Sequence, residues 1–157
     1  MQFSLYTGLR AKELAALRIS DVYDAEGAVR TQFTLSKSQT KGSRARTVFI
    51  NKQLTQQFAA YRKWRHCSDS NAPLFRSQKG GHFSANTMCQ LFLNIFYACG
   101  LQGASSHSGR RTFITRLANK GIGVRVLAAL AGHSSIAVTQ LYIDVNDEQL
   151  ANAVELL

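Results

Sequence analysis

Two arginines, two histidines and a tyrosine in this chain carry side chains that could together cut a phosphodiester bond. They are Arg10 near the start, and His107, Arg110, His133 and Tyr142 in the last third of the sequence. A guanidinium group binds phosphate oxygens through paired N–H donors, a histidine moves protons near neutral pH, and a tyrosine hydroxyl can attack phosphorus. This set of residues predicts cleavage of nucleic acid through a phosphotyrosine bond.

Each of these residues also has an ordinary structural explanation when it is taken alone. Arg10 lies three positions before Glu13, so the two could form an exposed helical ion pair that contributes little stability. Residues 107–110 (HSGR) could be the capped first turn of a basic helix, although such a turn also offers N–H groups to an anion. His133 could be structural, and Tyr142 could be a half-buried core residue.

The hydrophobic pattern predicts the elements that must position these residues. Leucines and alanines recur at helical spacing from the start of the chain to Arg18, and strand-like sequences follow at 22–23, 29–35 and 46–50. Further helices are expected from Asn51, a good N-cap residue, and then at 84–99, 107–120, 123–131, 135–143 and 147–157. We therefore expect an α+β fold, mostly α-helical, with helices around a small three-stranded antiparallel sheet.

Composition favours a nucleic-acid partner. Nineteen Lys and Arg against nine Asp and Glu give a net charge of +10, which suits a polyanion, although a solvated basic surface would give the same count. The three cysteines include no CxxC pair, so they predict reduced thiols in a cytosolic protein and neither a disulfide framework nor a zinc site. The start of the chain does not resemble a signal peptide, and no apolar run is long enough to span a membrane.

Five short motifs, taken together and in this order, resemble those of the catalytic domain of the tyrosine recombinases, the phage-integrase family. They cover nearly the whole chain and lie at 7–14 (TGLRAKEL), 41–46 (KGSRAR), 107–111 (HSGRR), 130–135 (LAGHSS) and 139–142 (TQLY). The resemblance implies that residues 1–157 form a catalytic domain that lacks the family's N-terminal DNA-clamping domain and the first part of its first helix. Gly109 stands where many relatives carry leucine, and we expect it to loosen local packing.

The resemblance also implies a role for each site residue. Tyr142 would attack a DNA phosphodiester to leave a 3′-phosphotyrosyl bond and a free 5′-hydroxyl. Arg10 and Arg110 would hold the non-bridging oxygens, and His133 would hydrogen-bond the phosphate. His107 would act as general base or proton shuttle. No metal or cofactor is expected, because the arginines supply the positive charge that magnesium supplies in other phosphoryl-transfer enzymes.

The remaining basic residues and Glu13 would support this centre. Lys41 would protonate the leaving 5′ oxygen, with Lys37 as the alternative acid, and Glu13 would orient its neighbours. The expected contacts to the DNA backbone come from four residues, Lys37, Arg44, Arg46 and Arg111.

The resemblance implies partners and leaves alternative functions open. The expected partners are double-stranded DNA and other protomers, which form a tetramer on DNA by exchanging residues 147–157 in trans, and no membrane partner is expected. The same segment could fold back in cis and hold Tyr142 away from the site. Without the clamp domain, DNA binding is expected to be weak, salt-sensitive and nearly non-specific. The alternatives are a type IB topoisomerase and a non-catalytic DNA-binding remnant or regulator. The expected location is the bacterial cytoplasm, at the nucleoid.

Overall fold

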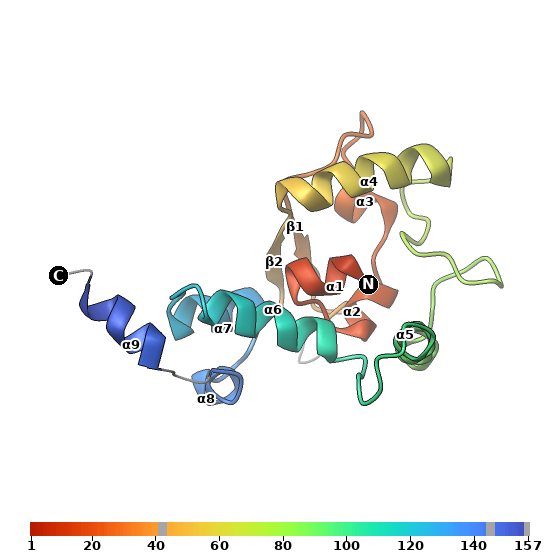
Figure 1. Ribbon diagram of the computed structural model, residues 1–157. Coiled ribbons are helices and arrows are strands. Elements are labelled where there is room, and N and C mark those ends of the chain that lie inside the picture. The colour runs from red at the N-terminus through yellow and green to blue at the C-terminus, as the bar shows by residue number, and fades with distance from the viewer. Residues whose placement is uncertain (41–43, 144–146, 156–157) are drawn as a thin grey trace.

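The computed structural model describes residues 1–40, 44–143 and 147–155 of the chain. Helices surround a small sheet, and the chain runs from a compact N-terminal part towards α7, α8 and α9 at the other end of the molecule, as Figure 1 shows. In chain order the elements are α1 (Gln2–Thr7), α2 (Ala11–Ala15), α3 (Ile19–Val22), β1 (Gln32–Leu35), β2 (Arg46–Phe49), α4 (Lys52–Arg65), α5 (Ala85–Ala98), α6 (Ser108–Ala118), α7 (Val124–Ala131), α8 (Ile136–Gln140) and α9 (Asp147–Val154). No helix in these described ranges is both long and apolar enough to cross a membrane.

The first predicted helix is interrupted, so the prediction of one continuous helix to Arg18 was wrong. Gly8 ends α1 with a left-handed backbone, φ +65°, and a Cβ atom there would lie 2.6 Å from Cδ1 of Phe113. Arg10 then has an extended backbone and begins α2, where its N–H donates to Oε2 of Glu13 at 2.8 Å. The break places Arg10 at the start of a new helix and not on the side of a long one.

The sheet has two strands in the described residues, one fewer than predicted. β1 and β2 pair antiparallel, with Phe33 opposite Val48, and both of these side chains are buried. The expected third strand is wrong because its sequence lies partly in the short helix α3. Asp21 accepts a hydrogen bond from the N–H of Arg18 at the start of that helix, and only an isolated bridge links Tyr23 to Val29.

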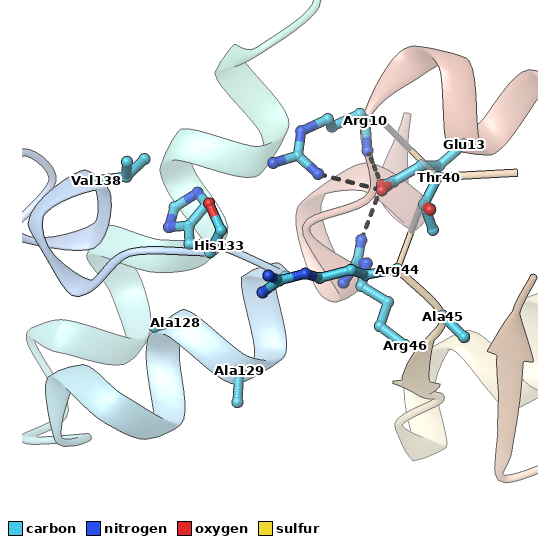
Figure 2. Close-up of a pocket in the computed structure, with 12 residues that line it drawn as sticks. Arg10, Glu13, Thr40, Arg44, Ala45, Arg46, Ala128, Ala129, His133 and Val138 are labelled. Atoms are coloured by element: carbon cyan, nitrogen blue, oxygen red, sulfur yellow. Dashed lines mark hydrogen bonds and ion pairs between the residues drawn. The ribbon is translucent and has the colours of Figure 1, made fainter. Parts of the chain in front are cut away.

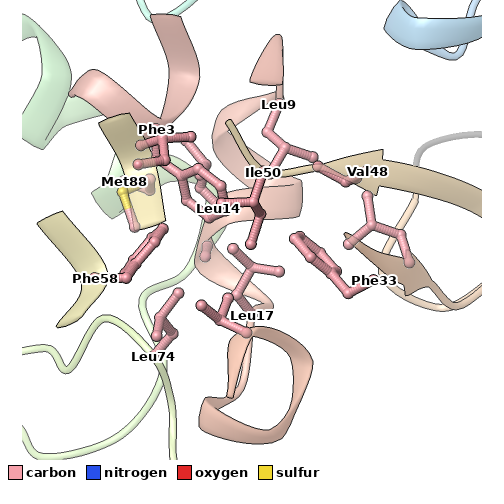
Figure 3. Packing of buried hydrophobic residues seen from close by; sticks show 14 of the residues in the cluster. Phe3, Leu9, Leu14, Leu17, Phe33, Val48, Ile50, Phe58, Leu74 and Met88 are labelled. Carbon is pink, nitrogen blue, oxygen red and sulfur yellow. The ribbon is translucent and has the colours of Figure 1, made fainter. Parts of the chain in front are cut away.

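One hydrophobic core joins the five helices α1, α2, α3, α4 and α5 with the sheet, as Figure 3 shows. Phe3 of α1 is central, because its ring meets Phe58 of α4 edge to face with a centroid distance of 4.8 Å. The predicted N-cap of α4 is confirmed, since Oδ1 of Asn51 accepts a hydrogen bond from the N–H of Leu54. α5 forms as predicted but buries Met88, Phe92 and Phe96 and leaves Leu91 37% exposed.

Helix α6 packs closely against α1, and Gly109 makes that contact possible. A Cβ atom on Gly109 would lie 2.6 Å from Oγ and 2.9 Å from Cβ of Ser4, and Ser4 is fully buried. The Ser4 hydroxyl donates to the carbonyl of Leu9, so it is held in place. The expectation that Gly109 loosens the packing was therefore wrong, because its missing side chain lets the two helices approach. This contact positions Arg110, the next residue of α6.

We predict that Gly109→Ala lowers the free energy of unfolding by about 1–3 kcal/mol, because the new methyl group overlaps Ser4. The sign of this change in the free energy of unfolding is informative, because a Gly→Ala substitution at an uncrowded helical position stabilises by roughly 0.5–1 kcal/mol. Urea unfolding followed by circular dichroism measures the difference. Gly81→Ala is the matched control, because a Cβ there meets nothing within 4 Å. A Gly109→Ala variant as stable as the wild type would contradict the close contact.

Candidate active site

A basic cavity of about 490 Å³ lies between α2, the chain around the start of β2, and the α7–α8 turn. Figure 2 shows that Arg10 and Glu13 lie on one wall and His133 lies opposite, with the Arg44 and Arg46 side chains between them. The cavity therefore gathers residues from the start, the middle and the end of the sequence. Its lining comprises Arg10, Glu13, Thr40, Arg44, Ala45, Arg46, Ala128, Ala129, Gly132, His133, Ser134 and Val138.

Glu13 holds two arginines of this cavity through one fully buried carboxylate. Its Oε1 accepts from NH1 of Arg10 at 3.2 Å, and its Oε2 lies 2.8 Å from NH2 of Arg46. The Arg10 side chain is 22% exposed, so part of its guanidinium faces the cavity. The alternative of an exposed, weak Arg10–Glu13 pair is wrong, because Glu13 has no solvent exposure.

Arg110 reaches the same region from α6 and is almost completely buried. Its NH1 donates to the carbonyl of Gly8 at 2.7 Å, while its NH2 is buried and has no hydrogen-bond partner within the described chain. Burial first, and then the charges of Arg10 and Arg46, lower the pKa of the Arg110 guanidinium to about 10. Arg110 therefore stays positively charged at neutral pH and keeps a free N–H donor, which an anionic ligand would satisfy.

His133 enters the cavity because Gly132 ends α7 with a left-handed backbone, φ +65°. Its Nδ1 lies 2.7 Å from the hydroxyl oxygen of Thr139, which is fully buried in α8. Burial, followed by the charges of Arg110, Arg10 and Arg46, lowers the pKa of His133 to about 4. His133 is thus neutral at physiological pH, and Thr139 fixes the orientation of its ring.

Tyr142 lies directly after α8, beside His133. The two rings stack with a centroid distance of 6.1 Å and an interplanar angle of 20°. Ser135 caps α8 by accepting a hydrogen bond from the N–H of Ala137, and the carbonyl of Tyr142 accepts from the hydroxyl of Thr115 on α6. These contacts hold Tyr142 near the arginine cavity. A negative charge on Tyr142 would raise the pKa of the Arg110 guanidinium.

The other predicted site residues are at exposed positions or lie outside the described residues. His107 precedes α6 and is exposed, three positions from Arg110, and Lys37 and Arg111 are also exposed. Lys41, the predicted general acid, lies outside the described residues. Within residues 1–40, 44–143 and 147–155, no three His, Cys, Asp or Glu side chains come together as metal ligands.

Two features of the site were not predicted. Arg46 was expected to contact DNA, but its side chain is only 9% exposed and binds protein groups on both sides. Thr139 was seen only as part of the motif around Tyr142, and its contact with His133 was missed. The sequence did carry a signal for this contact, because Thr139 lies between the two residues, six positions after His133 and three before Tyr142.

Comparison with known proteins identifies the family. The model of the phage integrase family matches residues 1–149. The chain belongs to the phage integrase family. It is 30% identical over 152 residues to the tyrosine recombinase XerA of Pyrococcus furiosus, covering 95% of this chain and 50% of that protein. It is 31% identical over 150 residues to the tyrosine recombinase XerD of Yersinia pestis, covering 92% of this chain and 48% of that protein.

Solved structures agree with this assignment. The crystal structure of XerA recombinase superposes with a TM-score of 0.77 at 28% identity, covering 98% of this chain and 54% of that one. The Tn1549 transposon integrase, solved in complex with a circular intermediate DNA, shares the fold with a TM-score of 0.75 at 24% identity, covering 99% of this chain and 56% of that one. The mostly helical fold with a small antiparallel sheet is therefore confirmed, and the chain spans about half the length of the relatives it matches.

We predict that His133 remains neutral down to about pH 4, because burial and three nearby arginines oppose its protonation. Since the unfolded chain binds this proton near pH 6.5, the free energy of unfolding should fall as pH falls from 6.5 to 4. NMR titration of the histidine ring signals, assigned with His133→Asn, measures the pKa. Arg10→Gln should raise it by removing a positive charge, whereas the exposed control Arg111→Gln should leave it unchanged. Titration of His133 near 6.5 in the wild type would contradict this account.

Proposed function

We propose that this chain is the catalytic domain of a site-specific DNA recombinase that cuts and rejoins DNA through a 3′-phosphotyrosyl intermediate. One observation carries the proposal: the ring of Tyr142 stacks on His133, the same histidine that faces the arginine cavity. A phenol nucleophile thus lies beside a site with an excess of positive charge and free N–H donors. The names of the relatives, tyrosine recombinases XerA and XerD, support the same activity.

The chemistry follows from the roles that the side chains can take. The Tyr142 hydroxyl oxygen forms a bond to phosphorus, its proton passes to His107, and the bond between phosphorus and the 5′ oxygen breaks. The 5′ oxygen takes a proton from Lys41, with Lys37 as the alternative donor. Rejoining is the reverse reaction with a 5′-hydroxyl from another strand, so the phosphotyrosine conserves the bond energy and no ATP is needed.

The cavity stabilises the charge that develops during this displacement. Arg10 offers its cavity-facing N–H groups to the non-bridging oxygens, and Arg110 offers its NH2, which has no partner in the described part of the chain. When Thr139 donates to Nδ1 of His133, the Nε2–H of the neutral ring becomes a further donor. Glu13 serves to hold Arg10 in place. Arg44 and Arg111, which are exposed, contact the DNA backbone together with Lys37.

The proposed partners are double-stranded DNA and further copies of the protein. The net charge of +10 suits binding to the DNA backbone. In α9, Leu150 is 55% exposed and Val154 is 67% exposed. This apolar side of the helix is available for docking on a neighbouring protomer in a tetramer. Action on DNA would place the protein at the nucleoid of a bacterial cell.

We expect the chain to form a covalent complex with nicked DNA that depends on Tyr142. A pool of nicked duplexes with randomised sequence around the nick traps the intermediate, because the short fragment that carries the new 5′-hydroxyl diffuses away after cleavage. The covalent species is measured as a slow band on a denaturing gel, at low salt to favour binding, and its DNA is sequenced. Tyr142→Phe should give no band, because it removes only the attacking oxygen.

The exposed residue Tyr97 provides the matched control, and Tyr97→Phe should react like the wild type. A covalent band with Tyr142→Phe, or no band with the wild type at saturating DNA, would overturn the proposed function. Enrichment of one sequence in the trapped DNA supports site-specific recombination. Trapping without enrichment, together with relaxation of supercoils, would favour a topoisomerase and contradict the site-specific part of the proposal.

A further inference from the structure

Arg46 makes three contacts that link separate parts of the cavity. Its NH2 forms an ion pair with Oε2 of Glu13 at 2.8 Å, and its NH1 donates to the carbonyl of Leu130 at 2.7 Å. The third contact is with Gly132, where a Cβ atom would lie 2.5 Å from Cδ and 2.9 Å from Nε of Arg46. The side chain therefore fills the space that a larger residue at position 132 would occupy.

These contacts do not suit an arginine that binds the DNA backbone. Phosphate recognition by arginine uses a pair of N–H groups of the guanidinium fork that face the ligand. In Arg46 both terminal nitrogens bind protein acceptors and the side chain is only 9% exposed. Its Nε has no hydrogen-bond partner among the described residues, but it is buried against Gly132, where a phosphate could not reach it. Arg44, two residues earlier, lines the same cavity but is exposed, so it can meet a phosphate without breaking a hydrogen bond or ion pair to another described residue.

The two acceptors of Arg46 lie on opposite sides of the cavity. Glu13 also binds Arg10, while Leu130 and Gly132 belong to the end of α7 that turns His133 towards the site. Figure 2 shows Arg46 between the two walls, joined through Glu13 to Arg10. Among the described residues, no direct hydrogen bond joins the wall that holds Glu13 to the wall formed by the end of α7. The rigid guanidinium fork of Arg46 joins the two walls and thereby fixes their separation.

We propose that Arg46 is a positioning residue that sets the separation of Arg10 and His133 for the attack by Tyr142, and that it does not bind DNA. This proposal rests on the function proposed above. Misplacing catalytic groups by about 1 Å can cost roughly a hundredfold in rate. Loss of Arg46 should therefore slow the covalent step and leave DNA affinity almost unchanged.

Two glutamine variants that each remove one positive charge test the proposal. Arg46→Gln should reduce the single-turnover rate of covalent complex formation at saturating DNA by about tenfold to a hundredfold. Its half-saturating DNA concentration should change by less than about threefold, and the salt dependence of binding should not change. Arg44→Gln should show the opposite pattern, with weaker binding and a slope of log K against log salt that is smaller by about one.

A conservative variant separates the shape of the guanidinium from its charge. Arg46→Lys keeps the positive charge but replaces the fork with a single ammonium group, which cannot span both acceptors in the same geometry. We expect its rate at saturating DNA to stay well below that of the wild type. Weaker DNA binding by Arg46→Gln with an unchanged maximal rate, or full activity of Arg46→Lys, would overturn the positioning role. Urea unfolding of each variant confirms that the folded form is compared.

A measurement without DNA distinguishes failure of this proposal from failure of the proposed function. In ¹H–¹⁵N NMR spectra, Arg46→Gln should shift the amide signals of Arg10 and of His133 together, because both walls lose the same link. Arg44→Gln should shift neither to a comparable degree. If the wild type forms no covalent complex, the proposed function fails while these spectra still test the link. Unchanged Arg10 and His133 signals in Arg46→Gln would overturn the proposal itself.

Discussion

The buried carboxylate of Glu13 is the interaction on which the candidate site depends. Two arginines bind it directly, and a third, Arg110, lies close enough for its pKa to respond to the same charges. Three guanidinium groups that are largely buried near one another repel strongly, because Coulomb energies grow as the effective dielectric constant falls. One carboxylate offsets only part of this repulsion, so the described part of the cavity keeps an excess of positive charge that an anion can neutralise.

This excess explains several other features of the structure. His133 is neutral because burial and the three arginines disfavour a fourth positive charge. Arg110 retains a buried N–H group without a partner among the described residues. This group costs free energy in the absence of a ligand and becomes useful when a phosphate oxygen accepts from it. A phosphodiester would thus complete the charge balance of a site whose donors are already in place, as electrostatic catalysis requires.

Most of the site was predictable because its residues belong to local sequence motifs, whereas their support was not. Arg10, Arg110, His133 and Tyr142 could be found from the sequence, and the structure gathers them around one region. The roles of Gly109, Arg46 and Thr139 depend on contacts between segments distant in sequence or in separate turns, and residue type alone does not reveal such contacts. The same limit applies to the fold: helix periodicity predicted α4 to α8 but missed the break at Gly8, where α1 ends with a left-handed backbone that lies against Phe113 of α6.

The most direct test of the central claim is the free energy of unfolding of Glu13→Gln, measured in urea. The amide keeps the size of the side chain but leaves Arg10 and Arg46 without their buried counter-charge, so stability should fall by about 3–5 kcal/mol. Glu26→Gln, at an exposed carboxylate, should change it by less than about 0.5 kcal/mol. If Glu13→Gln were as stable as the wild type, the carboxylate would not be the group that holds the arginines together.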